Sequence, residues 1–193
     1  MVRESKTQER RPTAQLMSYR ARQPVNVSID LPLETRASCH FLSNFVLLAP
    51  KDTRNGFLEF IVPLISTEAP VSHFKFAFDA CALASLSNKV GSSNAIELQA
   101  LTNYTKALSL TSTALRNGGS DATGNTLAAV FLLGLFEHIT ARHIKAWRSH
   151  IEGAMHLMAA KPPKPLWADD TSSLRSAVQM QMVSCFLPAL FSC

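Results

Sequence analysis

The chain has 193 residues, 47% of them apolar, which is enough for one globular domain with a sizeable core. Its seven glycines and the scarcity of alternating apolar runs argue against a β-sandwich or a barrel. The net charge is +5. Residues 1–24 hold six basic and two acidic residues, so they carry +4 of this charge and the rest of the chain is close to neutral. A basic tail of this kind is more often a solvated arm than a nucleic-acid binder.

The first thirty residues differ in character from everything that follows. They are polar and basic and contain two prolines, Pro12 and Pro24, and they lack the apolar core of a secretory signal. We therefore expect a disordered basic arm over residues 1–30 and a helical domain over residues 31–193.

Two helices are predicted next. The spacing of Phe41, Phe45 and Leu48 indicates a helix over residues 34–48. Ala49-Pro50 and Asn55-Gly56 end it and predict a loop. A short second helix is expected over residues 57–65, with a proline near its end.

A third helix, over residues 71–88, is apolar on two sides. A narrow polar strip remains, formed by Lys75 and Asp79 at a spacing of four residues. A helix that is apolar on two sides lies between layers, so we expect this helix to be central. One side is lined by Phe74, Phe78, Cys81 and Ser85, and the other by Phe76, Ala80 and Leu83.

A fourth helix is expected over residues 95–116, after a turn over residues 90–94. Six of its residues alternate at spacings of three and four, which predicts a packing seam inside the domain, flanked by Tyr104. The seam residues are Leu98, Leu101, Thr105, Leu108, Ser112 and Leu115.

Residues 125–161 predict the centre of the fold, a helical hairpin. Residues 127–136 are apolar all round, which indicates a buried helix, and about ten residues are too few for a membrane span of about 20. A polar link and an amphipathic helix follow, and the apolar face of that helix holds Trp147, Ile151, Ala154, Leu157 and Met158.

The C-terminal part predicts one more helix. The proline-rich residues 161–165 force an extended linker, and a last helix is expected over residues 172–186. Pro188 should end that helix, and the apolar end of the sequence suggests a chain that stops inside a larger helical domain. The predicted fold class is therefore all-α, with about six to seven antiparallel helices.

The cysteines are far apart and form no C-x-x-C pair. Cys39 and Cys81 stand among apolar helical residues, where we expect free thiols that behave as small hydrophobes. Together with Cys185 and Cys193 they fit a reducing compartment.

Four histidines, His138, His143, His150 and His156, lie close together in the sequence. Zinc ligands on a helix must lie on the same face, typically at a spacing of four residues. The gaps between these histidines are five, seven and six residues, which disfavours a metal site. A hydrogen-bonded packing role is expected for His150 instead.

No other pattern indicates a reaction or a bound group. The glycine-rich residues 118–124 lack the strand and the Gly-Lys-Ser/Thr ending of a phosphate-binding loop, and Glu137-His138 has no nucleophile placed beside it. We predict that the protein is not an enzyme, and we assign no catalytic, cofactor-binding or metal-binding residue.

Short sequence pieces, in their order along the chain, resemble the fungal-specific transcription factor domain. The resemblance spans about residues 38–183. The pieces are Phe41–Val46, Gly56–Leu64, Ala80–Ala84, Tyr104–Leu108, Thr126–Glu137 and the pattern Trp147-x-x-His150-Ile-x-Gly153-Ala154-x-x-Leu157. The family's DNA-binding module, a compact run of six cysteines that forms a binuclear zinc cluster, does not occur in this sequence.

The resemblance implies a regulatory region for transcription, located in the nucleus. Its expected partners are other transcription-regulatory proteins or a small effector, with no membrane contact and no specific DNA binding by this chain alone. The alternative is a helical-repeat scaffold of the tetratricopeptide kind, which Tyr104-x-x-Ala107-Leu108 loosely resembles. No period of about 34 residues recurs, which argues against that alternative.

Overall fold

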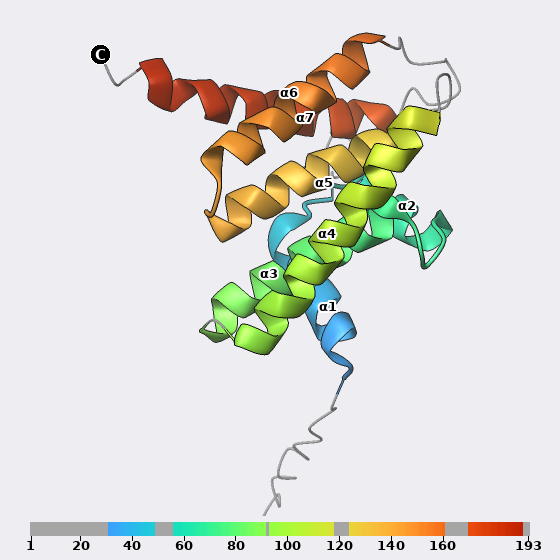
Figure 1. The fold of residues 1–193 in the computed structure, drawn as a ribbon, viewed down its shortest axis with the longest axis vertical. Coiled ribbons are helices and arrows are strands. Elements are labelled where there is room, and N and C mark those ends of the chain that lie inside the picture. Colours follow the sequence, from blue (N-terminus) through green and yellow to red (C-terminus); the bar gives the residue numbers. More distant parts are fainter. Residues whose placement is uncertain (1–30, 49–55, 92, 118–123, 161–169, 191–193) are drawn as a thin grey trace, which may run out of the picture. The chain divides into compact units, whose positions relative to one another are not determined.

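The computed structural model describes residues 31–48, 56–91, 93–117, 124–160 and 170–190, and in the last range the side chains of residues 172–183. These residues form seven α-helices and no strand, and an isolated bridge joins Leu47 to Phe57 (Figure 1). The predicted all-α class is confirmed. The helices are α1 (Leu33–Phe45), α2 (Ile61–Thr67), α3 (His73–Val90), α4 (Asn94–Asn117), α5 (Gly124–Thr140), α6 (Ile144–Ala160) and α7 (Asp170–Leu190).

Two helices form the centre of the domain. α3 packs against α1, α4 and α5, and α5 packs against α3, α4, α6 and α7. Every side chain of α5 from Ala128 to Glu137 is buried, and α6 packs along it. The predicted central position of the third helix and the predicted buried hairpin are both confirmed.

The ends of α3 follow from local chemistry. The Ser72 side chain caps the helix by accepting a hydrogen bond from the Lys75 backbone N–H at 3.1 Å. Gly91 ends the helix with a φ of +85°, a left-handed conformation that costs glycine little. The predicted polar strip is present as an ion pair between Lys75 and Asp79.

α1 ends three residues earlier than predicted. Val46 is extended, and the Leu47 backbone N–H donates to the Phe57 carbonyl at 2.9 Å, so the chain leaves the helix to form this bridge. Phe41 is buried as expected, whereas Leu48 is exposed. α2 begins later than predicted because Pro63 takes its third position, where a backbone N–H has no partner inside the helix.

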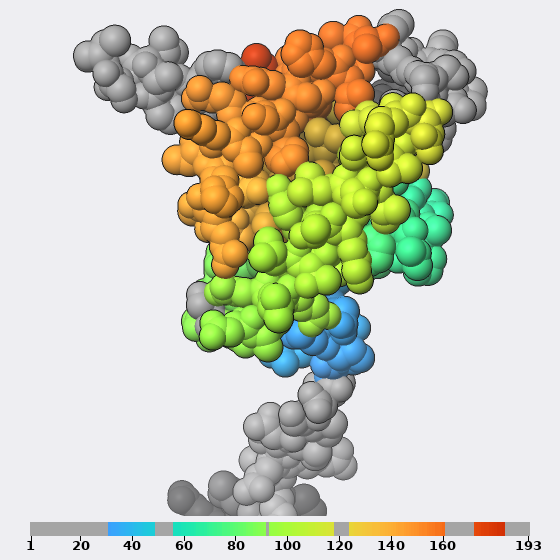
Figure 2. Space-filling model, in the orientation of Figure 1, coloured from blue at the N-terminus to red at the C-terminus, as the bar shows by residue number. Residues whose placement is uncertain are grey.

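The predicted seam of α4 is wrong. Leu98 is 66% exposed and Leu115 41% exposed, and Figure 2 shows α4 running along the surface of the domain. Small residues let α4 approach its neighbours closely, and the Tyr104 ring packs on α5, so the helix turns that neighbouring face inward. The buried residues of α4 are Ala100, Tyr104, Ala107 and Thr111.

α6 has the predicted amphipathic face, with Ile151 and Ala154 fully buried. Trp147 is only half-buried, and it connects three helices. Its ring lies 5.0 Å from the ring of His138 at the end of α5, and its Nε1–H donates to Gln181 of α7 at 2.9 Å.

α7 is longer than predicted and continues through Pro188 to Leu190. Pro188 removes one intrahelical hydrogen bond, but only two residues of the helix follow it. Within the described residues, no helix is long and apolar enough to cross a bilayer. The predicted arm over residues 1–30 and linker over residues 161–165 lie outside the described residues.

Candidate functional site

Three polar side chains from three helices meet in the core. Tyr104 of α4 donates its hydroxyl proton to Glu137 of α5 at 2.6 Å, and His150 Nε2 of α6 lies 3.2 Å from the same hydroxyl oxygen. Glu137 is 5% exposed, so its carboxylate depends on this partner. We call Tyr104, Glu137 and His150 the core network.

The environment fixes the protons of the core network. Burial, followed by the hydrogen bond to Glu137, raises the pKa of Tyr104, which therefore keeps its proton. Burial lowers the pKa of His150, although the charge of Glu137 opposes the shift, so the imidazole is neutral at pH 7. Because the single Tyr104 proton goes to Glu137, Nε2 of His150 carries a proton and donates it to the Tyr104 oxygen.

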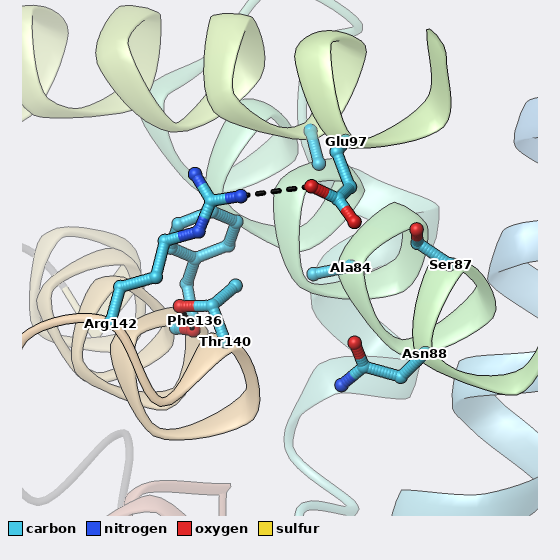
Figure 3. Close-up of a pocket in the computed structure, with 8 residues that line it drawn as sticks. Ala84, Ser87, Asn88, Glu97, Phe136, Thr140 and Arg142 are labelled. Carbon is cyan, nitrogen blue, oxygen red and sulfur yellow. Dashed lines mark hydrogen bonds and ion pairs between the residues drawn. The ribbon is translucent and has the colours of Figure 1, made fainter. Parts of the chain in front are cut away.

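A cavity of about 130 Å³ opens between the C-terminal end of α3, the first turns of α4 and the end of α5 (Figure 3). Ser87, Asn88 and Glu97 lie on one side, and Phe136, Thr140 and Arg142 on the other. The lining residues are Ala84, Ser87, Asn88, Glu97, Ala100, Phe136, Thr140 and Arg142.

Most polar groups of the cavity already have a partner. Arg142 donates to Glu97 at 2.9 Å, which joins the chain after α5 to the start of α4. Asn88 Nδ2 donates to the Ile139 carbonyl, and Thr140 Oγ1 to the Phe136 carbonyl, both at 2.9 Å. The Ser87 hydroxyl is the exception, since it is buried and has no hydrogen-bond partner among the residues that the structure describes.

Phe136 joins the cavity to the core network. Its ring lines the cavity and stacks on the Tyr104 ring, with centroids 4.4 Å apart. The cavity and the core network are therefore two sides of one feature, separated by a single pair of aromatic rings. This combined feature is the candidate functional site.

The structure separates Glu137 from His138. Glu137 points into the core toward Tyr104, whereas His138 is exposed and packs beside Trp147. The two neighbours in sequence do not form an acid–base pair. The core network itself offers a phenol, a carboxylate and an imidazole that bind one another inside the protein.

The four late histidines are not brought together. His150 is in the core network, which confirms the predicted hydrogen-bonded packing role. His138 contacts Trp147, and His143 and His156 are exposed. Among the residues that the structure describes, no group of three or more histidine, cysteine, aspartate or glutamate side chains could hold a metal ion.

The two cysteines whose side chains are described differ in environment. Cys81 is fully buried, its thiol donates to the Leu132 carbonyl at 3.1 Å, and burial raises its pKa, so it is an unreactive core residue as predicted. Cys39 is exposed, so the expectation that it packs as a small hydrophobe is wrong. It lies on the outward side of α1, between the buried Ala37 and Phe41.

Apart from the hydrogen-bonded role of His150, sequence reasoning missed both parts of the candidate site. Tyr104, Glu137 and His150 are far apart in the chain, and only the packing of α4, α5 and α6 brings them together. A signal was present, since all three belong to the pieces that carry the family resemblance. Nothing in the local sequence marks Ser87 as a hydroxyl without a partner.

One protein family was found to resemble the chain over most of its length. The family described as the fungal specific transcription factor domain matches residues 39–188. That range includes α2 to α6 and both parts of the candidate site. No curated protein and no solved structure matched the chain.

Proposed function

The chain belongs to the family of fungal-specific transcription factor domains, and from this we propose that it regulates transcription in the nucleus without catalysing a reaction. The observation that carries the proposal is the match over residues 39–188, which spans most of the described helices.

The chemistry of the core supports a non-enzymatic role. The acidic, basic and phenolic groups of the core network bind one another between α4, α5 and α6, with Tyr104 and Glu137 buried and His150 partly buried. Cys81, which could serve as a nucleophile in another setting, is buried and holds its proton. A core of this kind stabilises one arrangement of helices.

We further propose that this chain does not recognise a DNA sequence by itself. The family's zinc cluster is formed by a compact run of six cysteines. The 193 residues hold four cysteines, which are far apart in the sequence. The proposed partners are other transcription-regulatory proteins or a small effector that binds the helical domain.

The alternative, a helical-repeat scaffold, has one observation in its favour, the exposed leucines of α4. Repeats require similar units, and the successive helices α3, α4, α5 and α6 have 18, 24, 17 and 17 residues. α5 also packs against four other helices, as the centre of a globular domain does. The family match favours the regulator.

A reporter experiment tests the proposal. The full chain is fused to an unrelated DNA-binding domain, and transcription from a reporter with the matching site is measured in fungal cells. We expect a change of several-fold, in either direction, relative to the DNA-binding domain alone. Leu132→Asp, which places a charge in the core of α5, should abolish the change.

A variant with the same charge on the surface serves as the control. Leu98→Asp places the same charge on the exposed face of α4 and should leave the fold intact. A wild-type fusion that is present in the nucleus at the level of the control, yet leaves the reporter unchanged, would contradict the proposal.

A further inference from the structure

The Ser87 hydroxyl points to a ligand. Ser87 is 1% exposed, and within the described part of the chain its Oγ has no hydrogen-bond partner, which is unfavourable for a buried hydroxyl. A serine in a helix can normally donate to a backbone carbonyl of the preceding turn. Here the side chain instead lies in the wall of the cavity, where a bound group could accept its proton.

Glu97 can accept a hydrogen bond from an N–H group of a ligand. Its Oε2 accepts from Arg142 at 2.9 Å, and a carboxylate can accept several hydrogen bonds. The side chains of Glu97 and Arg142 are partly exposed, so they form an accessible wall of the cavity. The apolar part of the lining consists of Ala84, Ala100 and the Phe136 ring, and the two other polar residues, Asn88 and Thr140, already donate to backbone carbonyls.

The charge and size of the cavity narrow the ligand class. Glu97 and Arg142 neutralise each other, so a carboxylate or an ammonium ligand would have to break that pair, whereas a neutral ligand leaves it intact. The volume of about 130 Å³ is below the roughly 300 Å³ at which sites for drug-sized molecules begin. Only a small molecule of a few heavy atoms therefore fits.

We propose that this cavity binds a small neutral carboxamide, whose carbonyl oxygen accepts from Ser87 Oγ, whose N–H donates to Glu97 and whose short apolar part contacts Phe136. A primary carboxamide is a compact neutral group that carries both an acceptor and a donor. An effector role for such a ligand rests on the proposed function. The binding of the ligand does not depend on the proposed function.

The test is a titration of the full ¹⁵N-labelled chain with propionamide, followed by NMR. We expect saturable shifts, with a dissociation constant in the millimolar range because the ligand is so small. The shifts should be confined to the backbone amides around residues 84–88, 97–100 and 136–142. Propionate and propylammonium, of nearly the same shape but charged, should bind about tenfold more weakly or not at all.

A matched pair of variants identifies the donor. Ser87→Ala should weaken propionamide binding about tenfold while leaving the unfolding midpoint unchanged or higher, because it removes a hydroxyl that has no partner. Thr111→Val removes the other buried hydroxyl without a partner in the described residues, outside the cavity, and should leave binding unchanged.

Three results would overturn the proposal. The absence of saturable shifts would mean that water alone fills the cavity. Equal binding of propionate would show that the ligand class is wrong, and unchanged binding in Ser87→Ala would remove the proposed donor. None of these measurements depends on transcription, so an inactive reporter fusion and an empty cavity are separate findings.

Discussion

A single proton, that of the Tyr104 hydroxyl, decides how two buried groups and the partly buried His150 share two hydrogen bonds. It goes to Glu137, the charged acceptor, at 2.6 Å. His150 then has to donate to the Tyr104 oxygen, which fixes its tautomer and the orientation of its ring. Removal of the hydroxyl therefore leaves two buried polar groups without a partner.

Tyr104→Phe isolates that loss, because the stacking of the ring on Phe136 is kept. We expect the free energy of unfolding to fall by about 2–3 kcal/mol, as for a buried hydrogen bond to a charged group. Urea denaturation followed by circular dichroism measures the change. A loss below about 0.5 kcal/mol would show that Glu137 finds another partner or is solvated.

The protonation of His150 makes stability depend on pH. Burial lowers its pKa in the folded state, whereas in the unfolded state it takes up a proton near pH 6.5. Below that pH the unfolded state binds more protons, so the free energy of unfolding falls as the pH falls, by up to about 1.4 kcal/mol per pH unit for one histidine. Above that pH the contribution of His150 is constant.

His150→Gln should make the decline between about pH 7.5 and pH 5 less steep. The decline should not vanish, since burial also lowers the pKa of His73 and that residue titrates in the same direction. Urea midpoints over this range give the two slopes. Equal slopes for the variant and the wild type would mean that His150 is not shielded from solvent.

The close packing of α5 on α6 depends on Gly134. A Cβ at that position would lie 3.1 Å from Ile151 Cδ1 and 3.3 Å from His150 Cβ. At Gly153, on the other helix, a Cβ would meet only Val130 Cγ1 at 4.0 Å, an ordinary contact. Both helices have 17 residues. The space at Gly134 is too tight for a side chain, whereas Gly153 has room for one.

Alanine substitutions at the two glycines should change stability in opposite directions. Gly153→Ala should stabilise the protein by about 0.5–1 kcal/mol, because alanine favours the helix. Gly134→Ala should destabilise it by about 1 kcal/mol, because the cost of overpacking exceeds that gain. Thermal and urea unfolding of both variants test this, and stabilisation by Gly134→Ala would show that α5 and α6 are further apart.

The orientation of α4 gives another test. Leu98 is on the exposed face, whereas Leu132 of α5 is fully buried. Leu98→Ala should change stability by no more than about 0.5 kcal/mol. Leu132→Ala should cost about 2–5 kcal/mol, through lost burial and a new cavity. A cost above about 2 kcal/mol for Leu98→Ala would restore the seam that the sequence suggested.

For the molecule as a whole, the charge distribution sets the expected interaction with DNA. Outside residues 1–24 the chain carries about +1, so any attraction to phosphates comes from the basic tail. Such a tail can neutralise a few phosphates without holding side chains in register with base edges. We expect weak non-specific binding, with a dissociation constant on the order of 10⁻⁴ M at physiological salt.

Fluorescence anisotropy with several unrelated duplexes, at two salt concentrations, measures this binding. The slope of log K against log salt should be about −3 to −4 at most, since about 0.9 is lost per phosphate contacted. Deletion of residues 1–24 should abolish the binding. Discrimination between duplexes by a factor of about 10³ would instead indicate a sequence-specific surface on the helical body.

The sequence by itself determined the helical class and the two central helices. Periodicity and composition are enough to predict burial where a helix is apolar on all sides, as α5 is from Ala128 to Phe136. Such a helix is buried whichever neighbours pack around it. The same holds for α3, whose narrow polar strip leaves only one side for solvent. Ser72 and Gly91 add local signals for the start and the end of α3.

Only the tertiary structure decided which face of α4 is buried and which polar groups meet. α4 carries two candidate faces, one of leucines and one of alanines with Tyr104, and periodicity does not rank them. The choice depends on the partners, because the Tyr104 hydroxyl gains Glu137 and His150 only when the second face turns inward. Those partners are 33 and 46 residues away, so no local pattern contains them.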